Sequence, residues 1–294
     1  MRTPFYTPSP HRTLLSLTGP DVRDFLQGII TNDIRKVTPE RAIYAALLSP
    51  QGKFLHDFTI VQWKSALLLE CETARKDNLL QRLRMYKLRS KVEMEDVSDR
   101  LCVIAAYGGN ALEQLGLEHV PGHAVPHAHG VCFTDPRQAG LGARCFVARA
   151  HNALFSRSSG FAGTSFETYE QLRFEVGVPD GSRDFIVDRS LPLELGMDVL
   201  NGVDFAKGCY VGQEVTARSR YRGNVRKALY KVRAEAGVLP AAGTPVLAGG
   251  KEIGVLRSSA GNMGLAILRQ DAVKEGSALT TEGMLLDVNV PEWK

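Results

Sequence analysis

The pattern of local structure changes near residue 227, and this change constrains the fold more than any other feature of the sequence. Before it, helical and strand periodicities alternate and short hairpin turns join the strands, which is typical of an α+β fold built around antiparallel sheet. After it, short apolar runs are separated by glycines, and only residues 269–276 have room for a helical turn. We therefore expect a body over residues 1–226 and a small closed β-barrel over residues 227–294.

The body begins with an amphipathic helix and a strand meander. Val22, Phe25, Leu26, Ile29 and Ile30 recur at helical spacing and form one buried stripe. The sequence that follows predicts three antiparallel strands and a second helix: 42–48, 54–62, 66–71 and 73–88. Further strands are expected at 91–96, 101–107 and 143–149, and further helices at 110–116 and 166–176. The segment rich in proline and glycine predicts a loop: 120–130.

Composition excludes several classes of protein. Of the 294 residues, 44% are hydrophobic and 23% are charged, which is ordinary for a soluble chain that buries a large core. No apolar run approaches about 18 residues, so we expect no membrane helix. The net charge of +4 is not that of a dedicated nucleic-acid binder. The first ten residues contain three prolines and no apolar stretch, unlike a secretory signal.

Five cysteines are present, and none belongs to a C-x-x-C pair. An odd number without such pairs disfavours a disulfide framework and a four-cysteine metal site within one chain. His123, His127 and His129 lie in a segment rich in proline and glycine, where the pattern is a weak signal for a metal site, so we predict none there. The cysteine usage favours a reducing compartment, and we expect a cytoplasmic protein.

The most informative stretch runs from Lys207 to Glu214 and reads K-G-C-Y-V-G-Q-E. It places Cys209 between Gly208 and Gly212, which allow a tight turn of the backbone. Lys207 and the arginines that follow supply positive charge, which favours the thiolate form of a cysteine. A plainer interpretation stays open, in which the turn is structural and its cysteine simply packs, because small buried cysteines are common.

The stretch resembles the K-G-C-Y-x-G-Q-E signature of the YgfZ-type folate-binding proteins. These relatives of the glycine-cleavage aminomethyltransferase (T-protein) serve in iron–sulfur cluster assembly and repair. The matching positions are Lys207, Gly208, Cys209, Tyr210, Gly212, Gln213 and Glu214. Other segments match the family in the same order, and together they cover most of residues 14–226: 25–33, 48–54, 173–179 and 191–225.

The resemblance implies an aminomethyltransferase-like body of antiparallel sheets and helices, in two subdomains around a central channel, followed by a C-terminal β-barrel. It implies tetrahydrofolate, or one of its one-carbon derivatives, as the cofactor. It also implies iron–sulfur client enzymes or cluster carrier proteins as partners. From the composition we expect neither a nucleic acid nor a membrane among the partners.

On this resemblance, Cys209 is the functional thiol, with Lys207 beside it. One cysteine cannot hold a cluster alone, so the thiol either ligates a cluster transiently with outside ligands or undergoes reversible redox chemistry. Gln213 and Glu214 are candidates for direct function and, equally, for fixing the turn by hydrogen bonds to backbone donors.

Two acidic residues are the next candidates. Glu175 matches the family glutamate that clasps the pterin, where a carboxylate accepts hydrogen bonds from two adjacent donors. Asp57 matches a carboxylate that lies near the folate nitrogen in the aminomethyltransferases, where it follows a second acid. Here His56 precedes Asp57, so one carboxylate stands where the family has two. Strand alternation does not require Asp57 to be buried.

Three polar residues complete the candidate site. Arg218 and Arg226 are candidates for binding the negative tail of a folate or for holding the cysteine loop, because a planar guanidinium suits carboxylates. Ordinary surface arginines are an equal alternative. Asn32 matches a family position in a T-N-D segment, where closure of a helix end by its side-chain amide is favoured over ligand contact.

The sequence leaves three functions open. The leading one is a tetrahydrofolate-binding accessory protein for assembly or repair of iron–sulfur clusters in client enzymes, with or without turnover of its own. The alternative is a folate-dependent aminomethyltransferase of the glycine-cleavage type, against which the thiol motif and the replaced acid pair count. The third is a scaffold whose folate pocket is vestigial.

Overall fold

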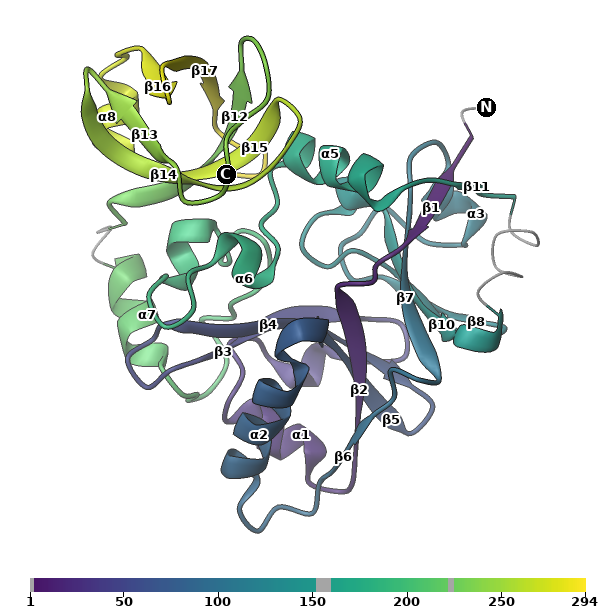
Figure 1. The fold of residues 1–294 in the computed structure, drawn as a ribbon. Coiled ribbons are helices and arrows are strands. Elements are labelled where there is room, and N and C mark those ends of the chain that lie inside the picture. Colours follow the sequence, from purple (N-terminus) through teal and green to yellow (C-terminus); the bar gives the residue numbers. More distant parts are fainter. Residues whose placement is uncertain (1–2, 152–159, 222–224) are drawn as a thin grey trace. The chain divides into compact units, whose positions relative to one another are not determined.

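The computed structural model describes residues 3–151, 160–221 and 225–294 (Figure 1). The chain forms two compact units. The first consists of three segments: Met1–Leu48, Leu55–Tyr169 and Leu200–Val211. The second also consists of three: Ser49–Phe54, Glu170–Val199 and Gly212–Lys294. Each unit is therefore built from segments that are far apart in the sequence.

A five-stranded sheet in the first unit has the order β3–β4–β5–β2–β6. Its strands are β2 (Arg12–Thr18), β3 (Ile43–Leu48), β4 (Phe54–Trp63), β5 (Ala66–Glu72) and β6 (Glu93–Asp96). The predicted strand meander is confirmed almost to the residue. Its register places Leu15 and Ile60 on either side of Leu69, and all three are fully buried. Such a buried apolar row fixes strand register, because a slip by one residue would expose every member.

A six-stranded sheet in the same unit has the order β11–β1–β7–β10–β9–β8. Its strands are β1 (Phe5–Pro8), β7 (Leu101–Tyr107), β8 (Ala124–His127), β9 (Gly130–Thr134), β10 (Ala143–Ala148) and β11 (Ala162–Gly163). The expected loop at 120–130 is therefore wrong, because β8 and the start of β9 form a hairpin there. Pro126 lies in β8, which is an edge strand, where the missing N–H of a proline is tolerated.

One apolar core is shared by residues of both sheets. Leu14 and Leu68 contribute from the five-stranded sheet, and Phe133 and Phe146 contribute from the six-stranded sheet. The two phenylalanine rings meet edge to face, with centroids 4.9 Å apart. This is a favoured aromatic geometry, and it fixes how β9 and β10 lie beside each other.

The described helices are short: α1 (Val22–Gln27), α2 (Lys76–Lys87), α3 (Ala111–Gln114), α5 (Phe166–Val176), α6 (Gly181–Asp184), α7 (Gln213–Tyr221) and α8 (Gln270–Lys274). Single 3₁₀ turns lie at Ile34–Lys36, Thr73–Arg75, Ala139–Leu141, Arg149–His151 and Pro192–Leu195. The helices expected at 73–88, 110–116 and 166–176 are confirmed. None of the helices in the described ranges has the length and apolarity needed to cross a bilayer.

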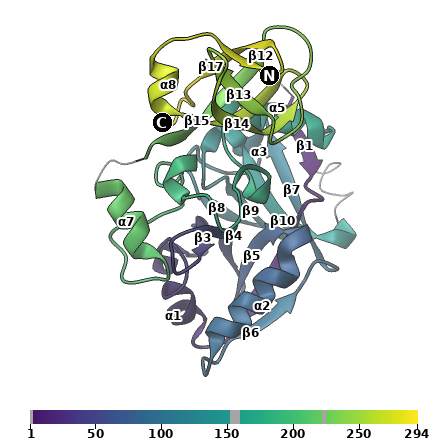
Figure 2. The same cartoon turned by 60° about the vertical axis from the view of Figure 1, so that its left-hand side comes forward.

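Six strands of the second unit close into a barrel in the order β12–β15–β14–β13–β16–β17, and β17 pairs back onto β12 (Figures 1 and 2). The strands are β12 (Lys227–Ala234), β13 (Pro245–Ala248), β14 (Lys251–Ala260), β15 (Met263–Arg269), β16 (Leu279–Thr281) and β17 (Met284–Asn289). The predicted barrel and the single helical turn beside it are confirmed. Closure removes the unpaired strand edges that an open sheet would expose.

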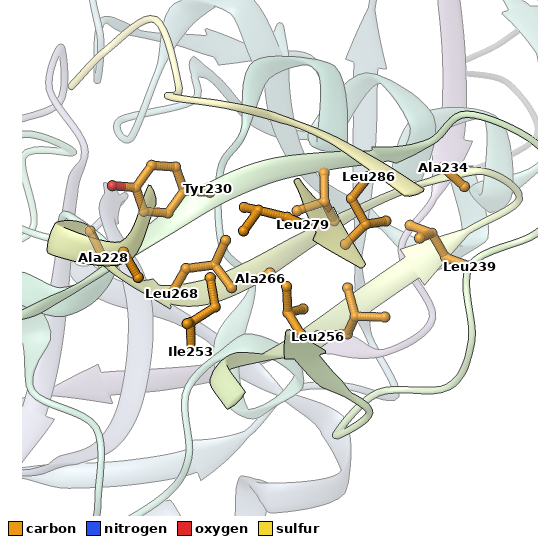
Figure 3. Close-up of a cluster of buried hydrophobic side chains, with 13 residues drawn as sticks. Ala228, Tyr230, Ala234, Leu239, Ile253, Leu256, Ala266, Leu268, Leu279 and Leu286 are labelled. Atoms are coloured by element: carbon orange, nitrogen blue, oxygen red, sulfur yellow. The ribbon is translucent and has the colours of Figure 1, made fainter. Parts of the chain in front are cut away.

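Side chains from the six barrel strands fill its interior (Figure 3). Ala228, Tyr230 and Val232 alternate inward along β12, while Leu256 of β14 and Leu268 of β15 are fully buried. The barrel begins at Lys227, where the C-terminal domain was expected to start. The second unit also contains residues 49–54 and 170–199, and the division into domains at residue 226 stays a prediction.

Candidate functional site

Two candidate residues of the first unit, Asn32 and Lys207, lie with Cys209 in or beside residues 204–211, which we call the cysteine loop. This loop lies beside the segment that contains the T-N-D sequence. Asp204 N donates a hydrogen bond to the carbonyl of Thr31 (3.0 Å), and Val211 N donates to the carbonyl of Gly28 (3.3 Å). Thr31 Oγ1 also donates to the carbonyl of Gly202 (2.6 Å). Two motifs that are far apart in the sequence are therefore hydrogen-bonded neighbours.

Lys207 is buried and holds the cysteine loop in place. Its ammonium donates to three backbone carbonyls, that of Gln27 at the end of α1 (2.8 Å) and those of Ile30 (2.6 Å) and Asn32 (3.0 Å) in the segment that follows. Carbonyls at a helix end lack intrahelical partners and carry partial negative charge, which favours a cation there. The ring of Tyr210 lies 5.0 Å from the same ammonium. Burial lowers the pKa of Lys207 to about 8, so the charged form still predominates at pH 7.

Asp204, which is not among the site residues predicted from the sequence, shapes the turn that precedes the thiol. Its Oδ1 accepts hydrogen bonds from the N–H groups of Ala206 (2.7 Å) and Lys207 (3.2 Å). Its other oxygen pairs with Lys36 (2.8 Å). An aspartate side chain that accepts a hydrogen bond from the N–H two residues later forms an Asx turn. An aspartate three residues before Lys207 was the sequence signal from which this turn could have been predicted.

Cys209 is exposed, and it differs in this from the other four cysteines. Cys71, Cys132 and Cys145 are buried, and Cys102 is half-buried with its Sγ 3.6 Å from the carbonyl of Val147. Burial raises the pKa of Cys71 to about 12, which makes that thiol inert. Cys209 is therefore the thiol of this chain that is most open to a partner or ligand.

The second half of the motif lies in the second unit and leads into α7. Gly212 has a φ of +83°, a left-handed conformation that suits glycine. Gln213 begins α7, and the exposed Glu214 forms an ion pair with Arg218 one turn later. Gly52 approaches this turn so closely that a Cβ there would lie 3.0 Å from the carbonyl of Gly212. An exposed pair of this kind contributes only a few tenths of a kcal/mol, roughly, so Arg218 can exchange partners.

Asn32 is buried, and its side-chain amide serves the backbone. The amide nitrogen donates to the carbonyls of Tyr44 (2.8 Å) and Asn201 (2.7 Å), and its oxygen accepts from the N–H of Asp33 (2.8 Å). These bonds join the T-N-D segment both to β3 and to the chain that enters the cysteine loop. Asn32 thus helps to position the cysteine loop, and its role toward a ligand stays a prediction.

Asp57 is buried, with its charge balanced by Arg12. Arg12 Nη1 lies 3.3 Å from one carboxylate oxygen, and the hydroxyl of Tyr44 donates to the other (3.1 Å). The pair belongs to a buried network of three guanidinium groups and three carboxylates: Arg12, Arg137, Arg144, Asp57, Glu70 and Asp135. A buried carboxylate needs such partners because burial of an unpaired charge is costly.

His56, which stands where the family has a second acid, is also buried. Its Nε2 lies 2.9 Å from Oδ1 of Asn78 in α2. Burial, and then the nearby positive charge of Arg75, lower the pKa of His56 to about 4. The ring is therefore neutral at pH 7 and joins β4 to α2.

Glu175 is exposed near the end of α5 in the second unit, where it lines an open cavity of about 390 Å³. Lys231 and Arg233 line the same cavity, together with the apolar side chains of Phe174 and Met263. Lys231 Nζ donates to the backbone carbonyl of Glu175 (3.0 Å). Asp287 and Glu292 also line it, so the cavity combines three carboxylates, two cations and apolar surface, which is a mixture that a polar aromatic ligand can use.

Arg226 lines a different cavity of the second unit, of about 600 Å³. Lys227 and Arg269 add positive charge to its lining, and Arg269 pairs with Asp271. Among the residues that the structure describes, no group of three histidine, cysteine or acidic side chains is arranged to hold a metal ion.

Sequence comparisons identify both parts of the chain. The profile of the GCVT N-terminal domain family matches residues 11–123. The profile described as the CAF17 C-terminal beta-barrel domain matches residues 226–294. The fold is also similar to that of the glycine cleavage system aminomethyltransferase T from Bartonella henselae, with a TM-score of 0.81, 16% identity, and coverage of 99% of this chain and 86% of that one. The aminomethyltransferase-like fold is therefore confirmed.

Similar curated proteins extend over nearly the whole chain. The iron-sulfur cluster assembly factor IBA57, mitochondrial, of Homo sapiens is 34% identical over 96% of this chain and 83% of its own length. The protein of the same name from Mus musculus is also 34% identical over the same shares. The expected cytoplasmic location is contradicted, because these relatives are named as mitochondrial proteins. The finer resemblance to YgfZ-type proteins stays a prediction. The chain belongs to the IBA57 family of iron–sulfur cluster assembly factors.

Proposed function

We propose that this chain assists iron–sulfur cluster assembly by offering the thiolate of Cys209 as a temporary ligand to a cluster that passes between proteins. The relatives named as iron–sulfur cluster assembly factors support the process. The exposure of Cys209, on a loop that Lys207 holds, is the observation that supports the residue. The cluster is cargo here and not a resident cofactor.

The chemistry of ligation limits what this chain can do alone. A thiolate donates a lone pair to iron and must lose its proton to do so. A [2Fe–2S] or [4Fe–4S] cluster needs about four protein ligands, and this chain supplies one exposed cysteine. The remaining ligands therefore come from the client or carrier protein, which makes the complex the functional state.

Replacement of Cys209 by serine tests the proposal. Cys209→Ser should abolish support of a cluster-dependent enzyme in a complementation assay, because a hydroxyl is a poor iron ligand. Thermal unfolding should be unchanged, since the side chain is exposed. Cys102→Ser is the matched control, because it removes a half-buried thiol and should leave complementation intact. Full activity of Cys209→Ser would remove the thiol from the mechanism.

We further propose that the chain binds tetrahydrofolate or one of its one-carbon derivatives, with Glu175 accepting hydrogen bonds from the pterin. The fold shared with the glycine-cleavage aminomethyltransferase supports this ligand class. The exposed carboxylate in a cavity beside Lys231 and Arg233 supports the residue. Arg218 and Arg226 remain the proposed partners of the folate tail, and Asn32 contributes by positioning the T-N-D segment.

Anaerobic calorimetry with tetrahydrofolate tests the folate proposal. Glu175→Ala should weaken binding by about 1.5–3 kcal/mol, the scale of a hydrogen bond to a charged group. Glu292→Ala removes a second carboxylate from the same cavity and changes the net charge equally, so it controls for electrostatics. Equal dissociation constants for the wild type and Glu175→Ala would count against the pterin clasp.

Aminomethyl transfer is the weaker alternative. The aminomethyltransferases have two adjacent acids at this place, and this chain keeps only Asp57. Its carboxylate is paired with Arg12 and accepts a hydrogen bond from Tyr44. A carboxylate in such a network is poorly suited to accept or donate a proton during turnover. We therefore expect no tetrahydrofolate-dependent release of ammonia from an aminomethylated carrier protein.

A further inference from the structure

The outer side of α2 and the turn that follows it form a surface that neither the cysteine loop nor the cavity at Glu175 explains. We define this α2 surface by Arg84, Met85, Leu88, Arg89 and Lys91, all of which are exposed. Met85 is 66% exposed and Leu88 is 87% exposed, which is unusual for large apolar side chains. All five residues belong to the first unit.

The α2 surface lies in a strongly basic segment of the chain. Residues 76–91 contain six basic side chains and one acidic side chain, a net charge of +5 in a chain whose total is +4. The side chains of Arg84, Arg89 and Lys91 form no ion pair within residues 3–151, 160–221 and 225–294. Unpaired charge of one sign around apolar side chains raises the local concentration of partners of opposite sign.

Leu88 has a backbone conformation that its side chain does not favour. Its φ of +47° and ψ of −113° correspond to the second residue of a type II′ turn, a position that glycine usually occupies. Leucine in this region costs about 1 kcal/mol or more. Burial does not offset this cost, because the side chain is in solvent. Neither packing nor backbone geometry therefore explains why a leucine stands here.

The turn that presents Leu88 is firmly held. Ser90 N donates to the carbonyl of Lys87 (2.9 Å), and Lys91 N donates to the carboxylate of Asp21 (2.7 Å). Val92, the next residue, is 1% exposed and anchors the chain after the turn. The strained leucine is thus fixed in position before any partner arrives, which reduces the entropy lost on binding.

The helix beneath is fixed as well. Leu79, Leu80 and Leu83 are buried, and Lys76 pairs with Asp96 at the start of α2. Figure 1 shows α2 lying beside the five-stranded sheet. The apolar stripe of the helix is therefore largely used by the core, and Met85 and Leu88 are the most exposed apolar side chains of the α2 surface.

A shallow cavity of about 390 Å³ lies on the same side of α2. Leu80 and Met85 contribute apolar walls, and Asp77, Gln81 and Arg84 contribute polar walls. Methionine adapts its shape to different partners, which is why it is common at binding surfaces. The cavity has room for an apolar side chain of a partner, with Arg84 at its edge for an acidic neighbour.

We propose that the α2 surface docks a protein partner through a segment in which acidic residues flank an apolar side chain. The apolar side chain packs between Met85 and Leu88, and the acidic residues pair with Arg84, Arg89 and Lys91. A membrane fits less well, because an interfacial helix inserts a continuous apolar face and α2 has buried its own. The proposal is independent of the cysteine and folate proposals.

Leu88→Gly separates binding from stability in a single substitution. Glycine removes the apolar contact and relieves the strained φ, so the variant should unfold at the same temperature as the wild type or a higher one. Its affinity for the partner should fall at least fivefold. Arg84→Glu reverses one unpaired charge and should weaken binding at least tenfold at low salt. Arg41→Glu, an exposed reversal in the segment bridged to Thr38 and His123, is the matched control.

The probe is a capped synthetic peptide with the sequence Glu-Asp-Leu-Leu-Asp-Glu, titrated into the full isotope-labelled chain and followed by amide chemical shifts. We expect saturable shifts at residues 77–91, weaker binding by Leu88→Gly and Arg84→Glu, and unchanged binding by Arg41→Glu. A Lys-Arg-Leu-Leu-Arg-Lys peptide should cause no shifts. The proposal would be overturned if the acidic peptide caused no shifts, or if the basic peptide bound equally well. It would also be overturned if Leu88→Gly and Arg84→Glu bound the acidic peptide as tightly as the wild type does, or if the chain bound phosphatidylglycerol vesicles more tightly than this peptide.

Discussion

At the scale of single residues, Lys207 is the side chain on which the geometry of the thiol depends. Lys207→Met removes a buried ammonium from three carbonyls and should lower the free energy of unfolding by about 2–4 kcal/mol, because those carbonyls lose a charged donor. It should also speed alkylation of Cys209, since the loop is no longer held. Urea unfolding and mass-spectrometric mapping of alkylated thiols measure the two effects.

Lys36→Met is the control for Lys207→Met. Lys36 also contacts the cysteine loop, through Asp204, but it is half-exposed and its ion pair is worth about 1 kcal/mol or less. If both methionine variants lose the same stability, the three carbonyl bonds do not hold the loop.

The sequence pointed to Lys207 but to a different role for it. Its position two residues before Cys209 favoured an electrostatic effect on the thiol, because neighbours along the chain are all that a motif shows. The acceptors of its ammonium belong to Gln27, Ile30 and Asn32. No local pattern reveals a contact between segments so far apart, although both segments were recognised as motifs.

At the scale of secondary-structure elements, His56 of β4 contacts Asn78 of α2, and burial favours the neutral form of its ring. Its pKa is about 4 in the folded chain against an ordinary value of 6.5, so the unfolded chain takes up a proton first as the pH falls. The stabilising contribution is therefore complete above pH 6.5 and is lost as the pH falls toward 4. The loss amounts to about 3 kcal/mol at most.

Urea unfolding at pH 7.5 and pH 5.0 measures this contribution. His56→Gln keeps a polar partner for Asn78 and cannot titrate, so its stability should change less between the two pH values than that of the wild type. Buried carboxylates such as Glu70 also make the protein less stable at lower pH. Burial disfavours the ionised form of Glu70, but the guanidinium groups of Arg144 and Arg12 outweigh this effect and hold the pKa of Glu70 below its usual value. Equal pH dependence of both proteins would show that His56 is not the group responsible.

Elements with strong local signals were predictable, and those that depend on distant partners were not. The strands β3, β4 and β5 follow from short apolar runs that turn residues at 50–52 and 64–65 separate. The strand β8 was missed because Pro126 signals a turn, and only its place at a sheet edge makes a proline acceptable. The burial of Asp57 was not foreseen either, because it requires Arg12 from another strand.

At the scale of the whole molecule, each unit is completed by segments that are far apart in the sequence. The C-terminal residues give an example in the second unit. Trp293 Nε1 donates to the carbonyl of Val176 at the end of α5 (3.0 Å). The indole ring also lies against Gly196, whose φ is +73°. A Cβ at position 196 would overlap Cζ3 of that ring. The ring therefore requires glycine there, both for space and for backbone conformation.

Gly196→Ala should lower the free energy of unfolding by about 2–4 kcal/mol, from the strained φ and from the clash with Trp293. Only the clash depends on the indole, so the two contributions can be separated by a double-mutant cycle with Trp293→Ala. In the alanine background at 293, Gly196→Ala should cost about 1–2 kcal/mol, which is the strain alone. Urea unfolding of the four proteins gives the coupling energy. A cost that is equal in both backgrounds would mean that the ring yields to the methyl group, and that the contact does not fix the end of the chain.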